Sequence, residues 1–374
     1  MIDDTQNAAE GLANDGEQTA RRSSEGGGDT VSYNCRSCGG ALEYSPKKSA
    51  LVCPYCGNSE TVEMKNVSER DFLSHASASE SWANEAFLYA CPNCGSTEVI
   101  DKDNLTHICP FCGTPAVLKS DALPGVKPDS LLPFTLSGAD AESAFKRWTK
   151  SRPFLPSALK KNVKADKFRG VFLPAWTFDD NAFSTYEGKL GKTYTVTVGS
   201  GKNQRVETRV RYFHVSGSLS EFFDDVCVNA SDKIEEKYFK KIQPYDTNGG
   251  AAYDKKFLVG FSAVRYGKDI NAAWEEAKGK IDAAVRAKIL SKYDYDRISY
   301  LNVNTTHSGT TFKYILLPLW ISAFHYGGRT FNFFVNGTNG NTAGKRPYSA
   351  PKILAAVGIG IAVIAAVAVL ITQI

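Results

Sequence analysis

The sequence predicts an α+β protein built from modules: two small cysteine-rich β units, a larger mixed α+β domain and one apolar C-terminal helix. Three observations predict this organisation. Eight of the nine cysteines form two copies of one spaced pattern, residues 129–342 alternate between strand-like and helix-like periodicity, and residues 353–372 carry no charge. A chain of 374 residues is long enough for two or three domains.

Residues 1–30 precede the first cysteine and are rich in acidic side chains. Seven Asp and Glu residues stand against only Arg21 and Arg22, and the segment has no aromatic residue. It cannot bury enough apolar surface to offset its chain entropy. We therefore expect a disordered acidic leader, and it has no apolar core that would indicate a secretory signal.

The paired cysteines form two sets with one internal spacing: CxxC, fourteen residues, CxxC. The first cysteine set is Cys35, Cys38, Cys53 and Cys56, and the second cysteine set is Cys91, Cys94, Cys109 and Cys112. Four thiolates on two tight turns are the ligands of a tetrahedral structural zinc ion. A glycine follows every CxxC turn, where positive φ turns backbone amides toward the sulfurs. The pattern predicts zinc ribbons at 31–64 and 89–120, with one structural Zn2+ each.

Other uses of these cysteines are less consistent with the sequence. Without a secretory signal the thiols are expected to stay reduced and free for metal. A redox CxxC normally occurs once, at the start of a helix. Four protein ligands leave no open coordination position, which favours structural over catalytic zinc. His107 could compete with Cys109 as a ligand, but a solvated strand residue is the favoured interpretation.

Between and after the ribbons the sequence predicts connecting segments and one domain. Residues 65–88 predict a helical spacer, and the proline-marked residues 121–128 predict a linker. Residues 129–342 form the predicted α+β domain. Apolar stripes predict its helices at 140–151 and 271–292, and alternation predicts strands at 169–186, 192–198, 205–212, 297–303 and 312–335.

Two segments of this domain repeat the motif Leu-Pro-x-Trp, at 173–176 and at 317–320. Each motif lies on an apolar strand that leads toward a turn, so we expect two related hairpins in one sheet. A proline inside a strand is typical of a sheet edge or a bulge. Buried tryptophan and proline side chains are more typical of packing than of ligand binding, so we assign the motif a structural role.

Motifs of the common enzyme classes are absent from the sequence. It contains no HExxH, GxSxG or dinucleotide-binding fingerprint, and the stretch Gly188–Thr193 has two residues between its glycines where a phosphate loop needs four. The pairs Asp179–Asp180 and Asp224–Asp225 lie on strands, where neighbouring side chains point to opposite faces, so neither pair chelates a metal alone. Cys227 is expected to be a buried, inert thiol. We predict no catalytic residue, no organic cofactor and no enzymatic activity.

Residues 353–372 are twenty apolar residues in a row. At about 1.5 Å per residue a helix of this length spans about 30 Å, the thickness of a bilayer core. The basic juxtamembrane segment 343–352 precedes it, and no basic residue follows. The positive-inside tendency then places the large N-terminal part in the cytoplasm. We predict a single-pass tail anchor in the inner or plasma membrane.

Small residues recur every fourth position on this helix, namely Gly358, Ala362 and Ala366. Stripes of small side chains let membrane helices approach closely. The stripe therefore suggests a homo-oligomer, although low sequence complexity alone would also produce the spacing.

The CxxCG turns, the Leu-Pro-x-Trp segments and Asn336–Thr342 together resemble a bacterial family over about residues 31–350. Its members are membrane-anchored proteins with tandem zinc ribbons of the transcription-factor-IIB type, and many carry the label "primosomal protein N′ (replication factor Y), superfamily II helicase". The resemblance implies protein partners in membrane-stress assemblies of the phage-shock and SPFH type. It does not support helicase activity here, because the phosphate loop is missing.

Two functional classes remain. The favoured one is a tail-anchored cytoplasmic adaptor or scaffold that binds protein partners at the inner face of the membrane. The alternative is a membrane-tethered nucleic-acid-binding protein of replication or transcription type. Against the alternative, the net charge is only +4, basic residues are sparse in both ribbons, and Glu207 interrupts the basic strand face at 205–211.

Overall fold

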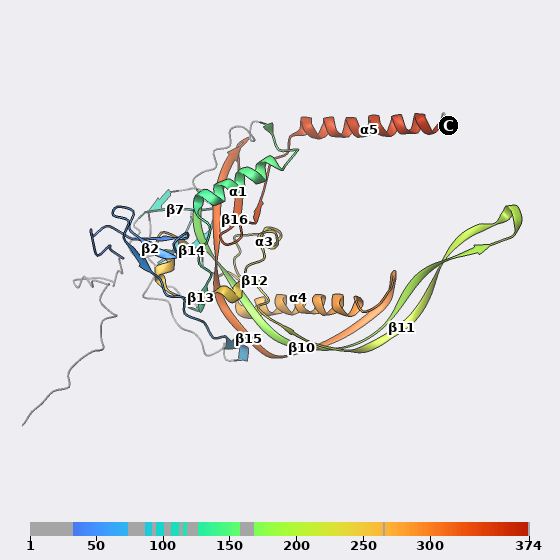
Figure 1. The fold of residues 1–374 in the computed structure, drawn as a ribbon, viewed down its shortest axis with the longest axis horizontal. Coiled ribbons are helices and arrows are strands. Elements are labelled where there is room, and N and C mark those ends of the chain that lie inside the picture. Colours follow the sequence, from blue (N-terminus) through green and yellow to red (C-terminus); the bar gives the residue numbers. More distant parts are fainter. Residues whose placement is uncertain are drawn as a thin grey trace, which may run out of the picture.

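The structure is a computed structural model that describes residues 33–73, 87–91, 95–100, 106–111, 115–117, 126–157, 168–264 and 266–372. The predicted acidic leader lies outside these residues, as does most of the predicted linker. The described part is a mixed α+β fold, as the sequence predicted, with one large curved sheet, two small sheets and several helices (Figure 1).

Four α-helices lie within the described residues: α1 (Gly138–Lys150), α3 (Glu236–Ile242), α4 (Ile270–Leu290) and α5 (Ala350–Thr372). Short 3-10 turns are η2 (Gly201–Asn203), η3 (Thr247–Gly249) and η4 (Lys255–Leu258). α1 and α4 coincide with the two helices predicted from apolar stripes. Both start at a side-chain cap: Ser137 and Asp140 form a capping box on α1, and Asp269 accepts from the amide of Ala272 on α4.

The strands fall into three sheets. The small three-stranded sheet is β1 (Glu43–Ser45), β2 (Ala50–Val52) and β3 (Ser59–Thr61), and a two-stranded sheet is β7 (Thr106–Ile108) and β8 (Pro115–Val117). The large sheet contains β4 (Arg70–Asp71), β5 (Phe87–Ala90), β6 (Thr97–Ile100), β9 (Ser130–Leu131), β10 (Arg169–Val198), β11 (Arg205–Phe223), β12 (Val228–Asn229), β13 (Ala251–Ala252), β14 (Ser262–Val264), β15 (Arg297–Tyr326), β16 (Arg329–Asn336) and β17 (Thr342–Gly344).

Two 30-residue strands, β10 and β15, pair antiparallel and run through the whole molecule. β11 pairs with the outer half of β10. We call residues 182–223 and 297–307 the arm, because this ribbon curves away from the rest of the protein (Figure 1). α4 lies along the inner side of the curve and buries Trp274, Ile281 and Ile289. The strands predicted separately at 169–186 and 192–198 are therefore one continuous strand.

The two Leu-Pro-x-Trp segments pair with each other, which confirms that the duplicated segments share one sheet. Pro174 lies opposite Leu316, and Pro318 lies opposite Phe172. The predicted edge or bulge position is wrong, because both prolines lie inside central strands. The carbonyl of Pro174 accepts from Ala230 (3.1 Å) and that of Pro318 from Gly337 (2.9 Å).

A residue's N–H and C=O point to the same side of its strand, so each proline nitrogen faces away from the β10–β15 ladder. Pro174 falls in the gap between β14, which pairs at 171–172, and β12, which pairs at 175–176. Pro318 falls between β9, which pairs at 315–316, and β16, which begins to pair at Leu319. Neither proline therefore removes a hydrogen bond between the two long strands.

The core on one face of the large sheet is aromatic. Phe134, Phe172, Phe261 and Trp320 pack with ring centroids 4.3–5.9 Å apart, and Phe145, Trp148 and Phe333 form a second group under α1. Both motif tryptophans satisfy their indole N–H: Trp176 donates to the carbonyl of Lys268 and Trp320 to that of Leu136. These contacts agree with the structural role assigned to the motif.

The predicted helical spacer at 65–88 differs from the structure in its described parts. Residues 70–71 form β4 and pair with β15, and residues 87–88 belong to β5. Residues 74–86 lie outside the described residues. Helical spacing of a few apolar side chains could not reveal that both ends of the segment join the large sheet as strands.

Candidate metal centre

The first cysteine set comes together in space. Cys35 and Cys38 lie on a turn before β1, and Cys53 and Cys56 lie on the turn between β2 and β3. All four sulfurs lie within 4.8 Å of one another, with Cys35 to Cys56 and Cys38 to Cys53 each at 3.4 Å. A tetrahedral ion with metal–sulfur bonds of about 2.3 Å places its sulfurs about 3.8 Å apart. The cluster therefore has the size and donor set that one thiolate-bound metal ion requires.

The backbone of both turns repeats one hydrogen-bond pattern. The amide of Cys35 donates to the carbonyl of Gly40 (2.7 Å), and the amide of Gly39 donates to Cys35 (2.8 Å). Cys53 and Gly57 repeat the two bonds at 2.8 and 3.0 Å. Gly39 and Gly57 have φ of 75° and 76°, a region that side chains with a Cβ rarely adopt. Since a Cβ at either position would meet nothing within 4 Å, the conformation and not the space requires glycine.

The thiols of this set differ strongly in acidity. Hydrogen bonds from the backbone amides of Ser37 and Cys38 lower the pKa of Cys35 to about 6. The backbone amide of Asn58 acts to lower the pKa of Cys56, but hydrogen bonding with the Cys35 and Cys38 thiols raises it to about 12. Four thiolates repel one another, so this set favours a bound cation that stabilises all of them together.

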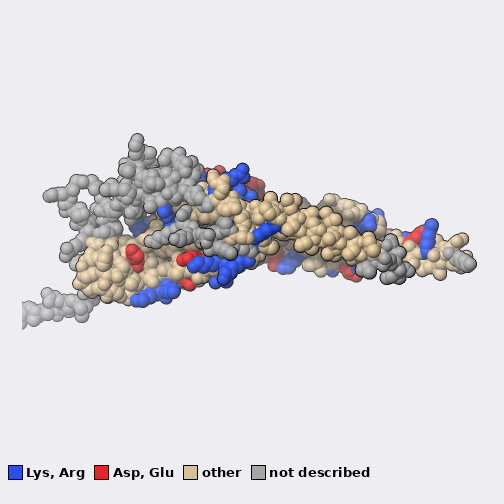
Figure 2. Space-filling model, turned by 90° about the horizontal axis from the view of Figure 1, so that it is seen from above, with Lys and Arg blue, Asp and Glu red and all other residues tan. Residues whose placement is uncertain are grey.

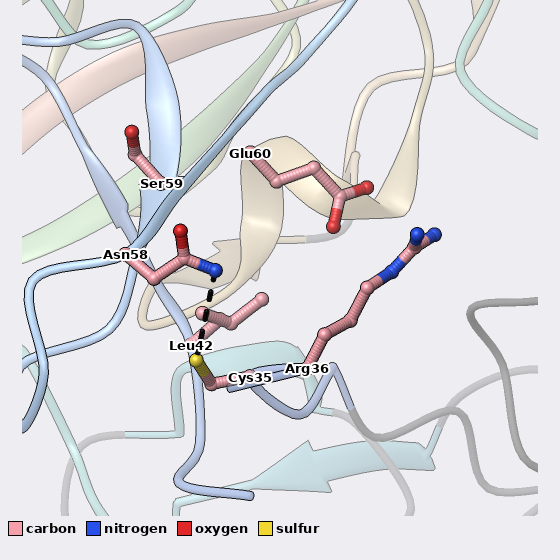
Figure 3. Close-up of a pocket in the computed structure, with 6 residues that line it drawn as sticks. All are labelled: Cys35, Arg36, Leu42, Asn58, Ser59 and Glu60. Carbon is pink, nitrogen blue, oxygen red and sulfur yellow. Dashed lines mark hydrogen bonds between the residues drawn. The ribbon is translucent and has the colours of Figure 1, made fainter. Parts of the chain in front are cut away.

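The cluster is half-exposed and rests on the body of the protein. Cys35 and Cys53 are buried, whereas Cys38 and Cys56 face solvent. Figure 3 shows the amide of Asn58 directed at the sulfur of Cys35, at 3.9 Å, within a small cavity beside the cluster. The set is fixed to the body by Tyr44, which packs against Phe257, and by Glu60, which pairs with Lys256 (3.3 Å).

The second cysteine set is described only in part. Cys94 and Cys112 lie outside the described residues, and Cys91 and Cys109 are both buried. The turn at Cys91 repeats the backbone pattern of the first set: Cys91 donates to Ser96 (2.8 Å) and Gly95 donates to Cys91 (2.9 Å), with Gly95 at φ 66°. The Ser96 hydroxyl lies 3.1 Å from the Cys109 sulfur. His107 lies on β7, consistent with the predicted strand.

The two sets are attached differently to the rest of the fold. The first set belongs to its own three-stranded sheet. The hairpin β5–β6 of the second set continues the large sheet, because β6 pairs with β14. In addition, the Lys233 ammonium donates to the carbonyl of Gly95 (3.0 Å). The second set is therefore built onto the edge of the body.

Sequence reasoning missed a partly buried charged cluster where the arm leaves the body. Carboxylate oxygens of Glu69, Asp179 and Asp225 lie within 4.8 Å of one another. The Lys313 ammonium lies 2.7 Å from Glu69 and 3.0 Å from Asp225. As expected for neighbours on a strand, Asp180 points to the other face, where it lies 2.7 Å from His307. One member of each aspartate pair thus joins Glu69, which only the folded topology could bring there.

Electrostatics makes this cluster hold a proton. Burial and a hydrogen bond with Glu69 raise the pKa of Asp179 to about 7. Burial also acts to raise the pKa of Glu69, but hydrogen bonds from Asp179, Lys313 and Thr311 lower it to about 2. The pair therefore shares one proton near neutral pH, and Lys313 supplies the positive charge. The cluster fixes β4 to β15 and acts as a structural ion network.

The C-terminal helix α5 is set apart from the fold. Its stretch Ala350–Val369 has a mean hydropathy of 2.5, and none of it is buried. A core helix of this composition would be mostly buried in the fold, and α5 is not. By length and composition, α5 is a candidate membrane span.

Fold and site together define an α+β protein with a four-cysteine cluster able to hold a metal ion and one candidate membrane-spanning helix. The chain is similar to a protein of Bacillus subtilis (strain 168) described as "Uncharacterized protein YdjG". The two are 26% identical over 329 residues, which cover 87% of this chain and 92% of that protein. No family model matches the chain, and no solved structure matches it.

Proposed function

We propose that the protein is a tail-anchored adaptor that binds protein partners at the cytoplasmic face of the inner or plasma membrane, within membrane-stress assemblies. The observation that carries the proposal is α5, a 23-residue helix that leaves the fold without burying its apolar surface. Such a surface is costly in water and favourable in a bilayer. The small sheet β1–β3, which carries the first cysteine set, lies on the side of the fold away from α5, so anchoring would present it to the cytoplasm (Figure 1).

We further propose that each cysteine set binds one Zn2+ as a structural ion. For the first set, the support is the sulfur geometry and a complete ligand set that leaves no coordination position for a substrate. For the second set, the support is the turn at Cys91, which has the same backbone hydrogen bonds and positive-φ glycine as the first two turns. Units this small need the metal to hold their fold.

Membrane attachment is tested by fractionation of cells that express the tagged full chain. We expect the protein in the carbonate-resistant membrane pellet. The variant Ile361→Lys/Ile364→Lys places two charges in the middle of α5 and should move it to the soluble fraction. The matched control Ile361→Leu/Ile364→Leu should stay in the pellet, and a soluble wild-type chain would overturn the proposal.

Adaptor function is tested by cross-linking followed by purification of the full chain from detergent extracts. We expect specific proteins that are lost when Cys35 and Cys38 are replaced by serine. Retention of nucleic acid without any specific protein would favour the nucleic-acid-binding alternative. That alternative also requires affinity for nucleic acid that falls steeply between two salt concentrations in a gel-shift titration.

A further inference from the structure

The end of the arm is a two-stranded hairpin that is held at its base, where Lys192 and Thr193 bind Asp294 and Asp296. β15 stops pairing with β10 at Arg297, opposite Gly191, and beyond that point only β10 and β11 continue. We call residues 192–211 the arm tip. A two-stranded hairpin without further contacts is marginally stable in water. A long hairpin of this kind therefore gains from a surface that covers one of its faces.

The register sorts the side chains of the arm tip into two unlike faces. Residues directly opposite each other share a face. One face carries Arg205, Arg209 and Arg211 on β11, and the opposing residues on β10 include Tyr194 and Lys192. The other face carries uncharged valine and threonine side chains, namely Thr193, Thr195, Thr197, Val206, Thr208 and Val210. The arm tip thus has one cationic face.

The positive charge of this face is only partly neutralised by the chain. Glu207 pairs with both Arg205 (2.8 Å) and Arg209 (3.2 Å), so one carboxylate serves two guanidinium groups. Lys192 is already paired with Asp294 and Asp296. Residues 189–214 contain six Lys or Arg and one Glu, a net charge of +5, against +4 for the whole chain. The excess positive charge of the protein is therefore concentrated at this end.

Tyrosines are exposed on both faces of this end of the arm. On the cationic face, Arg211 lies over the ring of Tyr194 at 5.4 Å, and that residue is 39% exposed. Tyr212, opposite Gly191, belongs to the other face, where Lys189 lies over its ring at 5.6 Å and Tyr212 is 47% exposed. Tyrosine combined with Lys and Arg is the composition that lies at the boundary between lipid and water, since the ring is apolar and its hydroxyl is polar.

The arm and α5 extend from the same side of the fold, and both views agree on this direction (Figures 1 and 2). Figure 2 shows α5 as an uncharged surface and, beyond its end, the arm tip with basic side chains. Residues 182–198 extend about 55 Å at 3.3 Å per residue, more than the roughly 34 Å of a 23-residue helix. Because the arm runs in the same direction as α5 and reaches beyond its end, insertion of α5 along that direction would drive the arm into the bilayer (Figures 1 and 2). The charges of the arm tip exclude it from the hydrocarbon, so the arm tip contacts this membrane only at the headgroups, with α5 turned relative to the arm.

We propose that the arm tip binds the anionic headgroups of the membrane into which α5 inserts, through Arg205, Arg209 and Arg211. The inference rests on the proposed membrane anchoring. The cytoplasmic leaflet carries anionic lipids, and each Lys or Arg near such a surface contributes about 1 kcal/mol of attraction. The protein would then contact the bilayer at two separated points, and its body would be held in a fixed orientation.

The test reconstitutes the full chain into lipid nanodiscs of neutral phosphatidylcholine, or of the same lipid with about one third phosphatidylglycerol. Amide hydrogen exchange is measured over residues 192–211. In anionic discs we expect exchange about fivefold slower than in neutral discs, and the difference should vanish in about 1 M salt, where screening acts over about 3 Å.

The variant Arg205→Gln/Arg209→Gln/Arg211→Gln should show the same exchange rate in both kinds of disc. If the variant and the wild type exchange at the same rate in neutral discs, the hairpin of the variant is folded. The control Lys237→Gln/Lys240→Gln/Lys241→Gln removes three exposed cations on α3 and should keep the wild-type difference.

Each other outcome decides against the inference in a distinguishable way. A chain that enters neither disc overturns both the anchoring and the arm-tip proposal. A chain that enters both discs with equal exchange at the arm tip overturns only the latter. Protection of the arm tip by added DNA or RNA, but not by anionic lipid, would identify the cationic face as a nucleic-acid surface instead.

Discussion

At the scale of single residues, the cysteine turns depend on their glycines as much as on their sulfurs. Gly39, Gly57 and Gly95 share φ between 66° and 76°, and each donates its amide to the carbonyl of the first cysteine. The sequence predicts positive φ at these positions, because a glycine follows each CxxC and this conformation lets the turn direct its amides toward sulfur. For the first set, the ligands, their spacing and the turn conformation could therefore all be predicted from the sequence.

Replacement of Gly39 by alanine tests that dependence. A Cβ in the left-handed region costs about 1–2 kcal/mol, so we expect Gly39→Ala to weaken metal retention by about tenfold. Competition with a chromophoric zinc chelator measures the change on the purified full chain. Gly279→Ala in α4 is the control, since Gly279 has a helical backbone and open space around it. Unchanged retention in Gly39→Ala would contradict the role of positive φ.

The carboxyl pair Asp179–Glu69 gives a pH dependence with a defined sign. The folded pKa of Asp179, about 7, exceeds its ordinary value of 3.8, so its contribution to stability is complete below 3.8 and is lost as pH rises through 7. Glu69, with a pKa of about 2, is already ionised throughout that window. Asp225 and Lys313 face the same pair. Burial acts to lower the pKa of Lys313, but hydrogen bonds with Glu69 and Asp225 raise it, so Lys313 stays charged in this window.

We therefore expect Asp179→Asn to become stabilised relative to wild type as pH rises from 5 to 8, because asparagine resembles the protonated acid. Urea midpoints in detergent, followed by tryptophan fluorescence, measure the difference at the two pH values. Asp224→Asn serves as the comparison, because that side chain is exposed and pairs with Asn248 (3.1 Å). A difference between Asp179→Asn and wild type that does not change with pH would refute the assignment.

At the scale of elements, the long strands β10 and β15 behave as a pair related by their shared motif. Each provides a proline at a gap between neighbouring strands and a tryptophan whose N–H reaches a loop carbonyl. The duplication could be predicted from the sequence, as could α1, α4 and much of β10, β11, β15 and β16. The register was not, because nothing local fixes which residues of two strands thirty residues long lie opposite each other.

Substitution of the two tryptophans tests this equivalence. Trp176→Phe and Trp320→Phe each remove an indole and leave a partly buried carbonyl, of Lys268 and Leu136 respectively, without its donor. We expect each to destabilise the protein by about 2 kcal/mol, from lost volume and a lost hydrogen bond. Chemical unfolding in detergent measures both. Tyr348→Phe, at an exposed aromatic position, should be neutral, and a neutral Trp176→Phe would mean that the motif has another purpose.

At the scale of the whole molecule, loss of metal from the two cysteine sets should unfold different parts of the protein. We expect zinc chelation to abolish exchange protection in β1–β3, whose sheet is separate, and also in β6 and β14, which belong to the large sheet. β10 and β15 should stay protected. Exchange mass spectrometry of the full chain before and after chelation measures this. Loss of protection confined to β1–β3 would mean that the second set binds no metal.

Other features of the whole molecule could not be predicted from sequence. The arm arises because β10, β11 and β15 extend beyond the elements that cover the sheet, apart from α4. The sequence does not reveal it, because the residue pattern of a solvent-exposed strand face is the same in a compact sheet and in a projecting one. The cluster of Glu69, Asp179, Asp225 and Lys313 combines residues that are up to 244 positions apart. Such assemblies depend on topology, which single-sequence periodicity does not specify.

The arm is also joined to the body at the ion cluster of Glu69, Asp179, Asp225 and Lys313. Glu69 and Lys313 tie the chain that follows the first cysteine set to the point where β15 enters the arm. With about 55 Å between the base of the arm and its far end, a rotation of about 5° at the base displaces the far end by about 5 Å. A small change in this network of a few side chains would therefore displace the far end by about one strand spacing.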